Sequence, residues 1–266
     1  MSSSTDGTLP ATFTLPSTTS AGVTITPKDM MRLSSVTFSS SYGTPSACAA
    51  CCVAAASDAL DRGVAGNLAS GFHHSHQDYG EGFCTFNGLV VAYERLRHEG
   101  RLRRALVLDM DLHYGNGTAS LLSTRPELYQ LSIYGNWYKK NLAYRDVSSE
   151  RAPDTDNAWS IPVPNGATGE EYLEILRGSL EASIDRSKPE LLLYQAGADP
   201  YKEDPYSPLL VDHEDLKARD RYVFEVCQRR GLPVMWVLAG GYTKDTSKVV
   251  QVHVNTFLAC QEVFGG

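Results

Sequence analysis

The sequence ALVLDMDLHYGNG, residues 105–117, is the strongest indication of the fold of this chain. Its first four residues are apolar and are typical of a short, fully buried strand. Asp109, Asp111 and His113 follow at intervals of two, so in an extended backbone their side chains leave on the same side. The glycines that come next allow a sharp turn into a helix. The stretch therefore predicts a strand of an open α/β sheet, with a polar site at its carboxyl end.

A divalent metal ion explains this polar cluster best, because burying unpaired charge costs roughly several kcal/mol. A second apolar strand, ELLLYQAGAD at residues 190–199, ends in Asp199. Asp111, His113 and Asp199 would then supply three ligands and leave room for water and a substrate oxygen, which is typical of catalytic zinc. Mixed nitrogen and oxygen donors also admit Fe(II), Co(II) or Mn(II).

Strands alternate with helices along the rest of the chain. Helices are predicted over 45–62, 89–98, 169–185, 212–230 and 247–263, with a short one after residue 116, and strands over 105–108, 128–134, 190–199 and 232–242. Residues 67–88 are predicted to form a glycine-rich loop, and the chain from the strand at 128–134 to about residue 159 to be irregular. Near-continuous apolar strands favour a single-domain open parallel sheet with helices on both faces.

Composition narrows the class of protein. The first 30 of the 266 residues are rich in Ser and Thr and are predicted to be a disordered leader, which leaves 31–266 as one domain. A net charge of −7 argues against direct nucleic-acid binding. Because there is neither a secretory signal nor an apolar run approaching the ~18 residues of a membrane span, we expect a cytoplasmic protein, or a nuclear one in a eukaryote. The oligomeric state stays open, with an oligomer allowed.

Two adjacent histidines lie in the glycine-rich loop. Alone, such a pair is more often a surface feature, but the flanking glycines and downstream acids favour a site in which His73 and His74 flank one water. Histidine can act as base and acid near neutral pH. Asp109 and Asn116 are the partners expected to orient the two imidazoles. Tyr242 follows paired glycines, so its phenol is a candidate to hydrogen-bond a developing oxyanion.

Taken together, these residues resemble the histone deacetylase superfamily, which includes acetoin-utilisation proteins and acetylpolyamine amidohydrolases. The matching pieces follow the family's order: GFHH (71–74), GFCTFNG (82–88), DMDLHYGNGT (109–118), IPVPNGATGEEY (161–172), QAGAD (195–199) and AGGY (239–242). The resemblance implies the arginase/deacetylase fold over residues 31–266. It also implies one Zn²⁺ per chain and hydrolysis of an acyl-lysine protein or an acylated small-molecule amine.

The resemblance also implies a role for each matching position. The family's zinc ligands are matched by Asp111, His113 and Asp199. His74 matches the general base and acid, and His73 the histidine that assists it electrostatically. Tyr242 matches the tyrosine that polarises the scissile carbonyl.

Further positions match parts that surround the zinc site. Gly82 and Phe83 match one wall of the channel for the acyl-lysine stem, and Trp137 or Tyr138 is expected on the other wall. A structural potassium ion would be held by main-chain oxygens and one hydroxyl, from Asp109, Asp111, His113 and Ser132.

Departures from the family keep alternatives open. Asn116 stands where some members have Asp, and because an amide cannot stabilise a protonated His74 as a carboxylate would, a lower pKa of His74 is expected. Relatives usually carry a longer region before the helix at 45, so part of the N-terminal region is expected to be missing. The leading prediction is a zinc-dependent deacylase. The alternatives are an acetylpolyamine amidohydrolase and a weakly active homologue that acts as a binding protein.

Overall fold

The protein, seen here as a computed structural model, is organised around one parallel β-sheet. The structure describes residues 45–139, 142–144 and 154–265, together with the short strands β1 (Phe13–Thr14), β2 (Thr24–Ile25) and β3 (Val36–Thr37). Side chains are described for residues 47–136 and 154–265. Almost all of the predicted leader therefore lies outside the described residues, and its state stays a prediction.

The described strands of the main sheet run parallel in the order β3-β4-β11-β10-β5-β6-β9. Apart from the two-residue β3, they are β4 (Val64–Ser70), β5 (Ala105–Asp109), β6 (Leu128–Tyr134), β9 (Ala158–Pro162), β10 (Leu191–Gly197) and β11 (Val234–Ala239). Strands β5 and β10 are neighbours, with Gln195 paired with Asp109. The two strands that lead to the predicted metal ligands thus end side by side.

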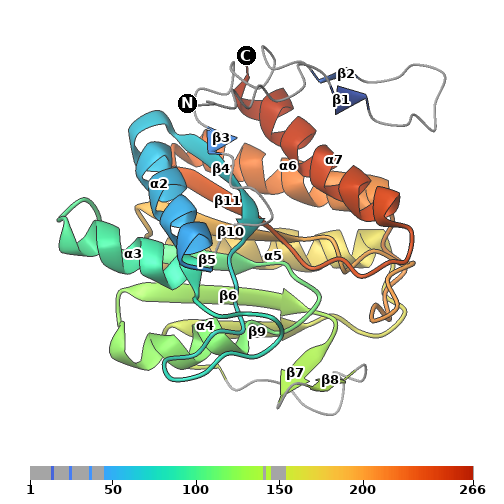
Figure 1. Ribbon diagram of the computed structural model, residues 1–266, viewed down its shortest axis with the longest axis horizontal. Helices are drawn as coiled ribbons and strands as arrows, with labels where there is room; N and C mark the ends of the chain where they lie inside the picture. The colour runs from blue at the N-terminus through green and yellow to red at the C-terminus, as the bar shows by residue number, and fades with distance from the viewer. Residues whose placement is uncertain are drawn as a thin grey trace, which may run out of the picture.

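Helices cover both faces of this sheet (Figure 1). On one face lie α2 (Pro45–Arg62) and α3 (Gly88–His98), and on the other α5 (Gly169–Ser187), α6 (His213–Arg230) and α7 (Thr246–Phe264). Alternate strand residues face the two layers, so Leu193 packs in the core with α2 while Tyr194 packs in the core with α6. The predicted α/β fold, a parallel sheet covered on both faces, is confirmed.

Local sequence accounts for where the long helices begin. Thr168 and Glu171 form a reciprocal capping box at the start of α5, and Asp212 and Asp215 do the same for α6. Helix α6 ends at Arg230 and is capped by Gly231, whose φ of 60° is the left-handed conformation that glycine adopts without strain. These signals explain why the predicted helix boundaries agree closely with the observed ones.

Strands β4, β7 (Trp137–Lys139), β8 (Leu142–Tyr144) and β9 were not predicted. Residues 67–70 were assigned to a loop, but they belong to β4, where Gly66 and Asn67 interrupt the apolar pattern. A Cβ on Gly66 would overlap the ring of Trp236, so this position has no room for a side chain. The chain around residue 159 was predicted to be irregular, but Ala158–Pro162 forms β9 at the sheet edge, where proline is tolerated. Strands β7 and β8 pair in the same stretch.

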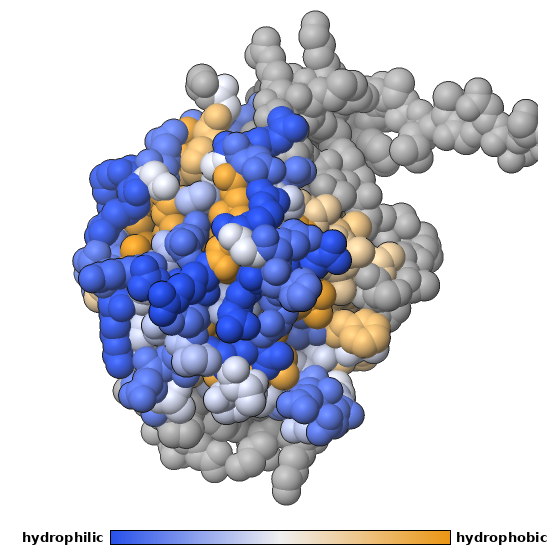
Figure 2. All heavy atoms as spheres, turned by 90° about the vertical axis from the view of Figure 1, so that its left-hand side faces the viewer, coloured by the Kyte–Doolittle hydropathy of each residue, from blue (hydrophilic) through white to orange (hydrophobic). Residues whose placement is uncertain are grey.

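The side of the molecule at the left of Figure 1, where α2 and α3 are seen, is mostly hydrophilic, with scattered hydrophobic residues (Figure 2). Exposed ion pairs along α3 join Arg95 to Glu99 and Arg97 to Glu94. Such pairs keep this face solvated and add little to stability. No helix in the described part of the chain combines the length and the apolar character that crossing a bilayer requires.

A buried ion pair lies directly beneath the strand ends. Arg219 and Asp220 on α6 are fully buried, and Nε of Arg219 donates to Oδ1 of Asp220 at 2.8 Å. Nη1 of Arg219 also donates to the carbonyls of Met110 at 3.3 Å and Gly197 at 2.8 Å. Because these carbonyls follow β5 and end β10, the guanidinium ties together the two strands that lead to the site.

Replacing Arg219 with Met should therefore lower the free energy of unfolding by about 3–5 kcal/mol, because the carboxylate of Asp220 is left buried without its cation. Urea denaturation followed by circular dichroism measures the loss. The matched control is Arg221→Met on the same helix, where the exposed Arg221 pairs with Glu225 and the change should stay within about 0.5 kcal/mol. Equal effects of the two substitutions would contradict the tying role of Arg219.

Candidate active site

The three predicted metal ligands come together where β5 and β10 end. One ligand atom from each of Asp111, His113 and Asp199 lies within 4.8 Å of the other two. Nδ1 of His113 is 3.2 Å from Oδ1 of Asp111 and 3.1 Å from Oδ2 of Asp199. All three residues are at most 5% exposed. Two buried carboxylates that face one imidazole form a donor set suited to a divalent metal ion such as zinc.

Carboxylates also hold the backbone that presents these donors. Oδ1 of Asp109 accepts from the amide of Asp111 at 3.1 Å, and Oδ1 of Asp111 accepts from the amide of His113 at 3.0 Å. Oδ1 of Asp199 accepts from the amide of Leu112 at 2.8 Å, which links the ends of β10 and β5. Aspartate side chains often accept from the backbone amide two residues further on. Asp109 and Asp111 therefore also fix the conformation of the turn that follows β5.

Two glycines leave space around the carboxylates. A Cβ on Gly240 would overlap the carboxylate of Asp199. A Cβ on Gly197 would lie 2.6 Å from Cα of Asp111 and 2.9 Å from Oδ1 of Asp199. A larger residue at either position would push the donors out of place. The donor set and its glycine surroundings therefore fit the zinc ion that the sequence predicts.

The charges of the site call for a cation. Burial lowers the pKa of His113, but its hydrogen bonds to Asp111 and Asp199 outweigh burial and raise the pKa to about 10. Burial, together with the charge of Asp111, raises the pKa of Asp199 to about 7, against the effect of His113. Two carboxylates that flank one imidazole both stay charged only when a positive charge, a protonated imidazole or a metal ion, compensates them.

The predicted histidine pair lies beside this cluster. Nδ1 of His73 donates to Oδ2 of Asp109 at 2.7 Å, and its Nε2 lies 3.6 Å from Oδ1 of Asp111. Nδ1 of His74 is 2.6 Å from Oδ1 of Asn116. The two rings are 3.9 Å apart, and the ring of His74 is 6.0 Å from that of His113. Each imidazole thus contacts the partner that the sequence predicted for it.

The two histidines differ in charge. Burial lowers the pKa of His73, but Asp109 and Asp111 outweigh burial and raise the pKa to about 9. Burial and the neighbouring His73 hold the pKa of His74 well below its ordinary value. The direction for His74 agrees with the prediction, but the main cause is burial, because the hydrogen bond to Asn116 raises the pKa. His73 therefore carries a proton when His74 is neutral.

Backbone contacts fix the histidine pair against α4 (Asn116–Leu121). The amide of Thr118 donates to the carbonyl of His73 at 3.0 Å. A Cβ on Gly117 would lie 2.5 Å from the carbonyl carbon of His74, so the first turn of α4 packs directly on the dipeptide. Glycine is therefore required at position 117, because a side chain there would overlap the backbone of the histidine pair.

Tyr242 lies next to the cluster and is 38% exposed. Its ring is 6.2 Å from that of His113 and 5.2 Å from that of Tyr206. Its amide donates to Oδ2 of Asp204 at 2.6 Å, which anchors the loop after β11. Burial and the charge of Asp199 raise the pKa of Tyr242, so the phenol keeps its proton and can donate a hydrogen bond.

Asp204 and Tyr206 were not singled out from the sequence. The available signal was that Asp204-Pro205-Tyr206 repeats Asp199-Pro200-Tyr201 shortly after the predicted metal ligand Asp199.

Phe83 is 91% exposed with a φ of 65°, a conformation that costs a non-glycine residue about 1–3 kcal/mol. The role of Phe83 in the channel wall stays a prediction.

Two parts of the prediction stay open. Trp137 and Tyr138 form part of β7, but their side chains lie outside the described residues, so the second channel wall stays a prediction. Ser132 is paired with Asp109 across β6 and β5, and its Oγ accepts from the amide of Gly115 at 3.4 Å. Potassium binding here also stays a prediction.

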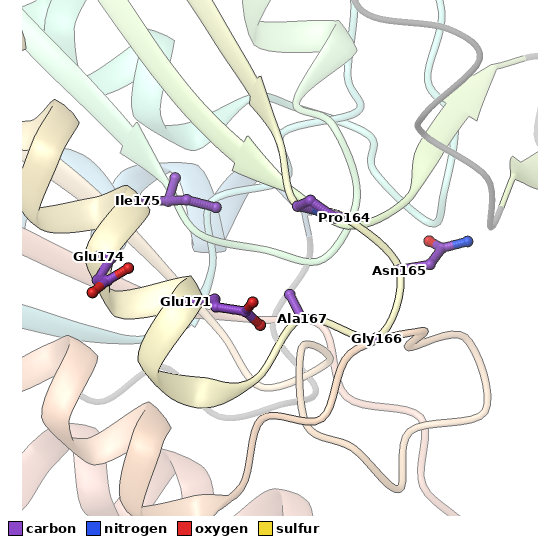
Figure 3. Close-up of a pocket in the computed structure, with 7 residues that line it drawn as sticks. All are labelled: Pro164, Asn165, Gly166, Ala167, Glu171, Glu174 and Ile175. Atoms are coloured by element: carbon purple, nitrogen blue, oxygen red, sulfur yellow. The ribbon is translucent and has the colours of Figure 1, made fainter.

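A separate hollow of about 520 Å³ lies where β9 leads into α5 (Figure 3). It is lined by Pro164, Asn165, Gly166, Ala167, Glu171, Glu174 and Ile175. The carboxylate of Glu171 is engaged with Thr168 in the capping box of α5. Because no predicted site residue lines this hollow, we assign it no role in the chemistry.

Comparison with known proteins supplies independent findings. Residues 14–257 match the sequence model of the histone deacetylase domain. An uncharacterized protein of Picosynechococcus sp. is 32% identical over 206 residues, which cover 77% of this chain and 65% of that protein. Histone deacetylase 2 of Arabidopsis thaliana is 30% identical over 198 residues, which cover 74% of this chain and 49% of that protein.

A solved structure has the same fold. The crystal structure of acetylpolyamine aminohydrolase from Burkholderia pseudomallei matches with a TM-score of 0.63 at 25% identity, covering 81% of this chain and 62% of that one. The chain spans about half to two thirds of the length of these relatives.

Proposed function

The chain belongs to the histone deacetylase family, and from this we propose that it is a zinc-dependent hydrolase that removes acyl groups, chiefly acetyl, from lysine side chains. The observation that carries the proposal is the convergence of Asp111, His113 and Asp199 beside His74 in one buried cluster. A zinc ion bound by the three ligands would supply a Lewis acid that lowers the pKa of water and polarises the substrate carbonyl.

His74 is the proposed general base. Its Nδ1 faces Oδ1 of Asn116, which can only accept, so the proton of the neutral ring is on Nδ1 and Nε2 can take a proton from water. The low pKa of His74 keeps the ring neutral before reaction. The proton taken up at Nε2 can then pass to the leaving amine, so that one imidazole serves as base and as acid.

His73 and Tyr242 stabilise charge in the proposed reaction. Burial lowers the pKa of His73, but the charge of Asp109 and the hydrogen bond to it raise that pKa, so the ring stays protonated and places a positive charge beside Asp109 and Asp111. The protonated phenol of Tyr242 donates to the carbonyl oxygen as negative charge develops on it. Phe83 is exposed, and we propose that its ring contacts the apolar stem of an acyl-lysine.

A second candidate is hydrolysis of acetylated polyamines, which the similarity to the acetylpolyamine aminohydrolase favours. A panel of acyl-lysine peptides and acetylpolyamines, assayed with and without a chelator, tests both. We expect turnover of acyl-lysine peptides that the chelator removes and zinc restores. Preferential turnover of acetylpolyamines would support the second candidate. Bound zinc without turnover of any substrate would reject both and favour a binding protein.

Replacing Tyr242 with Phe should lower kcat by about 100- to 1,000-fold, since one donor to the developing oxyanion is removed. Steady-state kinetics and zinc content are the measurements, and zinc content should not change. Tyr79→Phe is the control, because Tyr79 is 57% exposed and stacks on His76. An unchanged kcat for the Tyr242 variant would remove the phenol from the mechanism.

A further inference from the structure

Glu81 is a nearly buried carboxylate that the mechanism above does not use. It is 9% exposed, and its Oε2 accepts from Nδ2 of Asn116 at 3.0 Å. Its own amide donates to the carbonyl of His74 at 3.1 Å. The loop that follows the histidine pair thus folds back, and its carboxylate reaches the side chain that contacts His74.

The orientation of the Asn116 amide is decided by its neighbours. A carboxylate only accepts hydrogen bonds, so the NH₂ group of Asn116 must face Glu81. The opposite end, Oδ1, also accepts from the amide of Gly117 at 2.9 Å. Both contacts therefore direct Oδ1 toward Nδ1 of His74.

This orientation selects the tautomer of His74. Oδ1 of Asn116 requires a proton on Nδ1, which leaves Nε2 able to accept one. A reversed amide would place its NH₂ group against Nδ1 and move the ring proton to Nε2. In that tautomer the ring could not act as a base at Nε2.

We propose that Glu81 is a positioning residue that acts through Asn116 to hold His74 in the tautomer with its proton on Nδ1. Glu81 also places a negative charge one amide away from His74, which the neutral Asn116 cannot provide. This inference rests on the proposed role of His74 as the base. The hydrogen bond from the amide of Glu81 to the carbonyl of His74 does not involve the carboxylate. A substitution of the Glu81 side chain therefore keeps this backbone bond in the loop and removes only the contact with Asn116.

Two substitutions of Glu81 test the proposal by kinetics. Glu81→Met removes the acceptor and should lower kcat by about 10- to 100-fold with little change in KM, as expected for a residue behind a catalytic group. Glu81→Gln keeps an acceptor and removes the charge, so its loss should be smaller. The control is Asp78→Asn, an exposed carboxylate in the same loop, which should leave kcat unchanged. An unchanged kcat for Glu81→Met would overturn the proposal.

A swap of the amide and the carboxylate gives a sharper test. Asn116→Asp alone sets a second carboxylate against Glu81, and the repulsion should lower kcat. Adding Glu81→Gln supplies an NH₂ donor to the new carboxylate, which can still accept from Nδ1 of His74. The double variant should therefore recover most of the kcat that Asn116→Asp loses. If the loss of kcat in the double variant equals the product of the losses in the Asn116→Asp and Glu81→Gln single variants, the two residues are not coupled and the proposal is contradicted.

A readout that does not depend on turnover separates this proposal from the proposed function. Nitrogen-15 NMR of histidine-labelled, zinc-loaded protein distinguishes the two neutral tautomers, and the His74→Ala spectrum identifies the His74 signals. We expect the proton on Nδ1 in the unmodified protein and a mixture of tautomers in Glu81→Met. That result upholds the positioning role even if no substrate is turned over. The same tautomer in both proteins would reject the role whatever the activity.

Discussion

Replacing Asp199 with Asn is expected to abolish tight metal binding and to lower turnover by about 1,000-fold or more, because the activation of water by the metal ion is lost. The amide oxygen of Asn can still accept from Leu112, so the link between β5 and β10 is retained. The variant loses the negative charge of Asp199, which would balance the positive charge of the metal ion. Zinc content after dialysis and turnover of an acetyl-lysine peptide measure the two losses.

The control for this experiment is Asp185→Asn on α5, where the carboxylate is exposed and pairs with Arg230. It should keep one zinc per chain and full turnover. Retention of tight zinc binding and activity by the Asp199 variant would show that Asp199 is not a metal ligand.

Replacing His74 with Ala is expected to lower kcat by about 100- to 10,000-fold while zinc stays bound, because general acid and base catalysis is worth that much. His74 contributes no ligand atom to the cluster of Asp111, His113 and Asp199. Kinetics and metal analysis on the same preparation therefore distinguish the two roles. His98→Ala, at the exposed end of α3, is the control and should behave like the unmodified protein.

Two outcomes would contradict the role of His74. Full turnover would remove His74 from the chemistry. Loss of zinc together with activity would show that the residue supports the metal site, not the proton transfer.

Local patterns were sufficient for much of this architecture. Four apolar residues followed by acids at intervals of two identify β5, because a buried strand excludes charge until it reaches the sheet edge. Capping residues such as Thr168 and Asp212 give the helix starts, since they satisfy the free amides of the first turn. Strand β4 was not predicted because Gly66 and Asn67 have low strand propensity. Their identities are explained by tertiary contacts, with the ring of Trp236 and with Cys52 respectively.

The fold class and the donor types of the predicted metal site can be inferred from the amino-acid sequence, because both follow from periodicity and side-chain chemistry along short stretches. The groups that act on one another across the chain are seen only in the folded protein. The contact of Glu81 with Asn116 and that of Asp204 with Tyr242 join residues 35 and 38 positions apart. No local pattern encodes such contacts, since they arise where separate loops pack around the ends of adjacent strands.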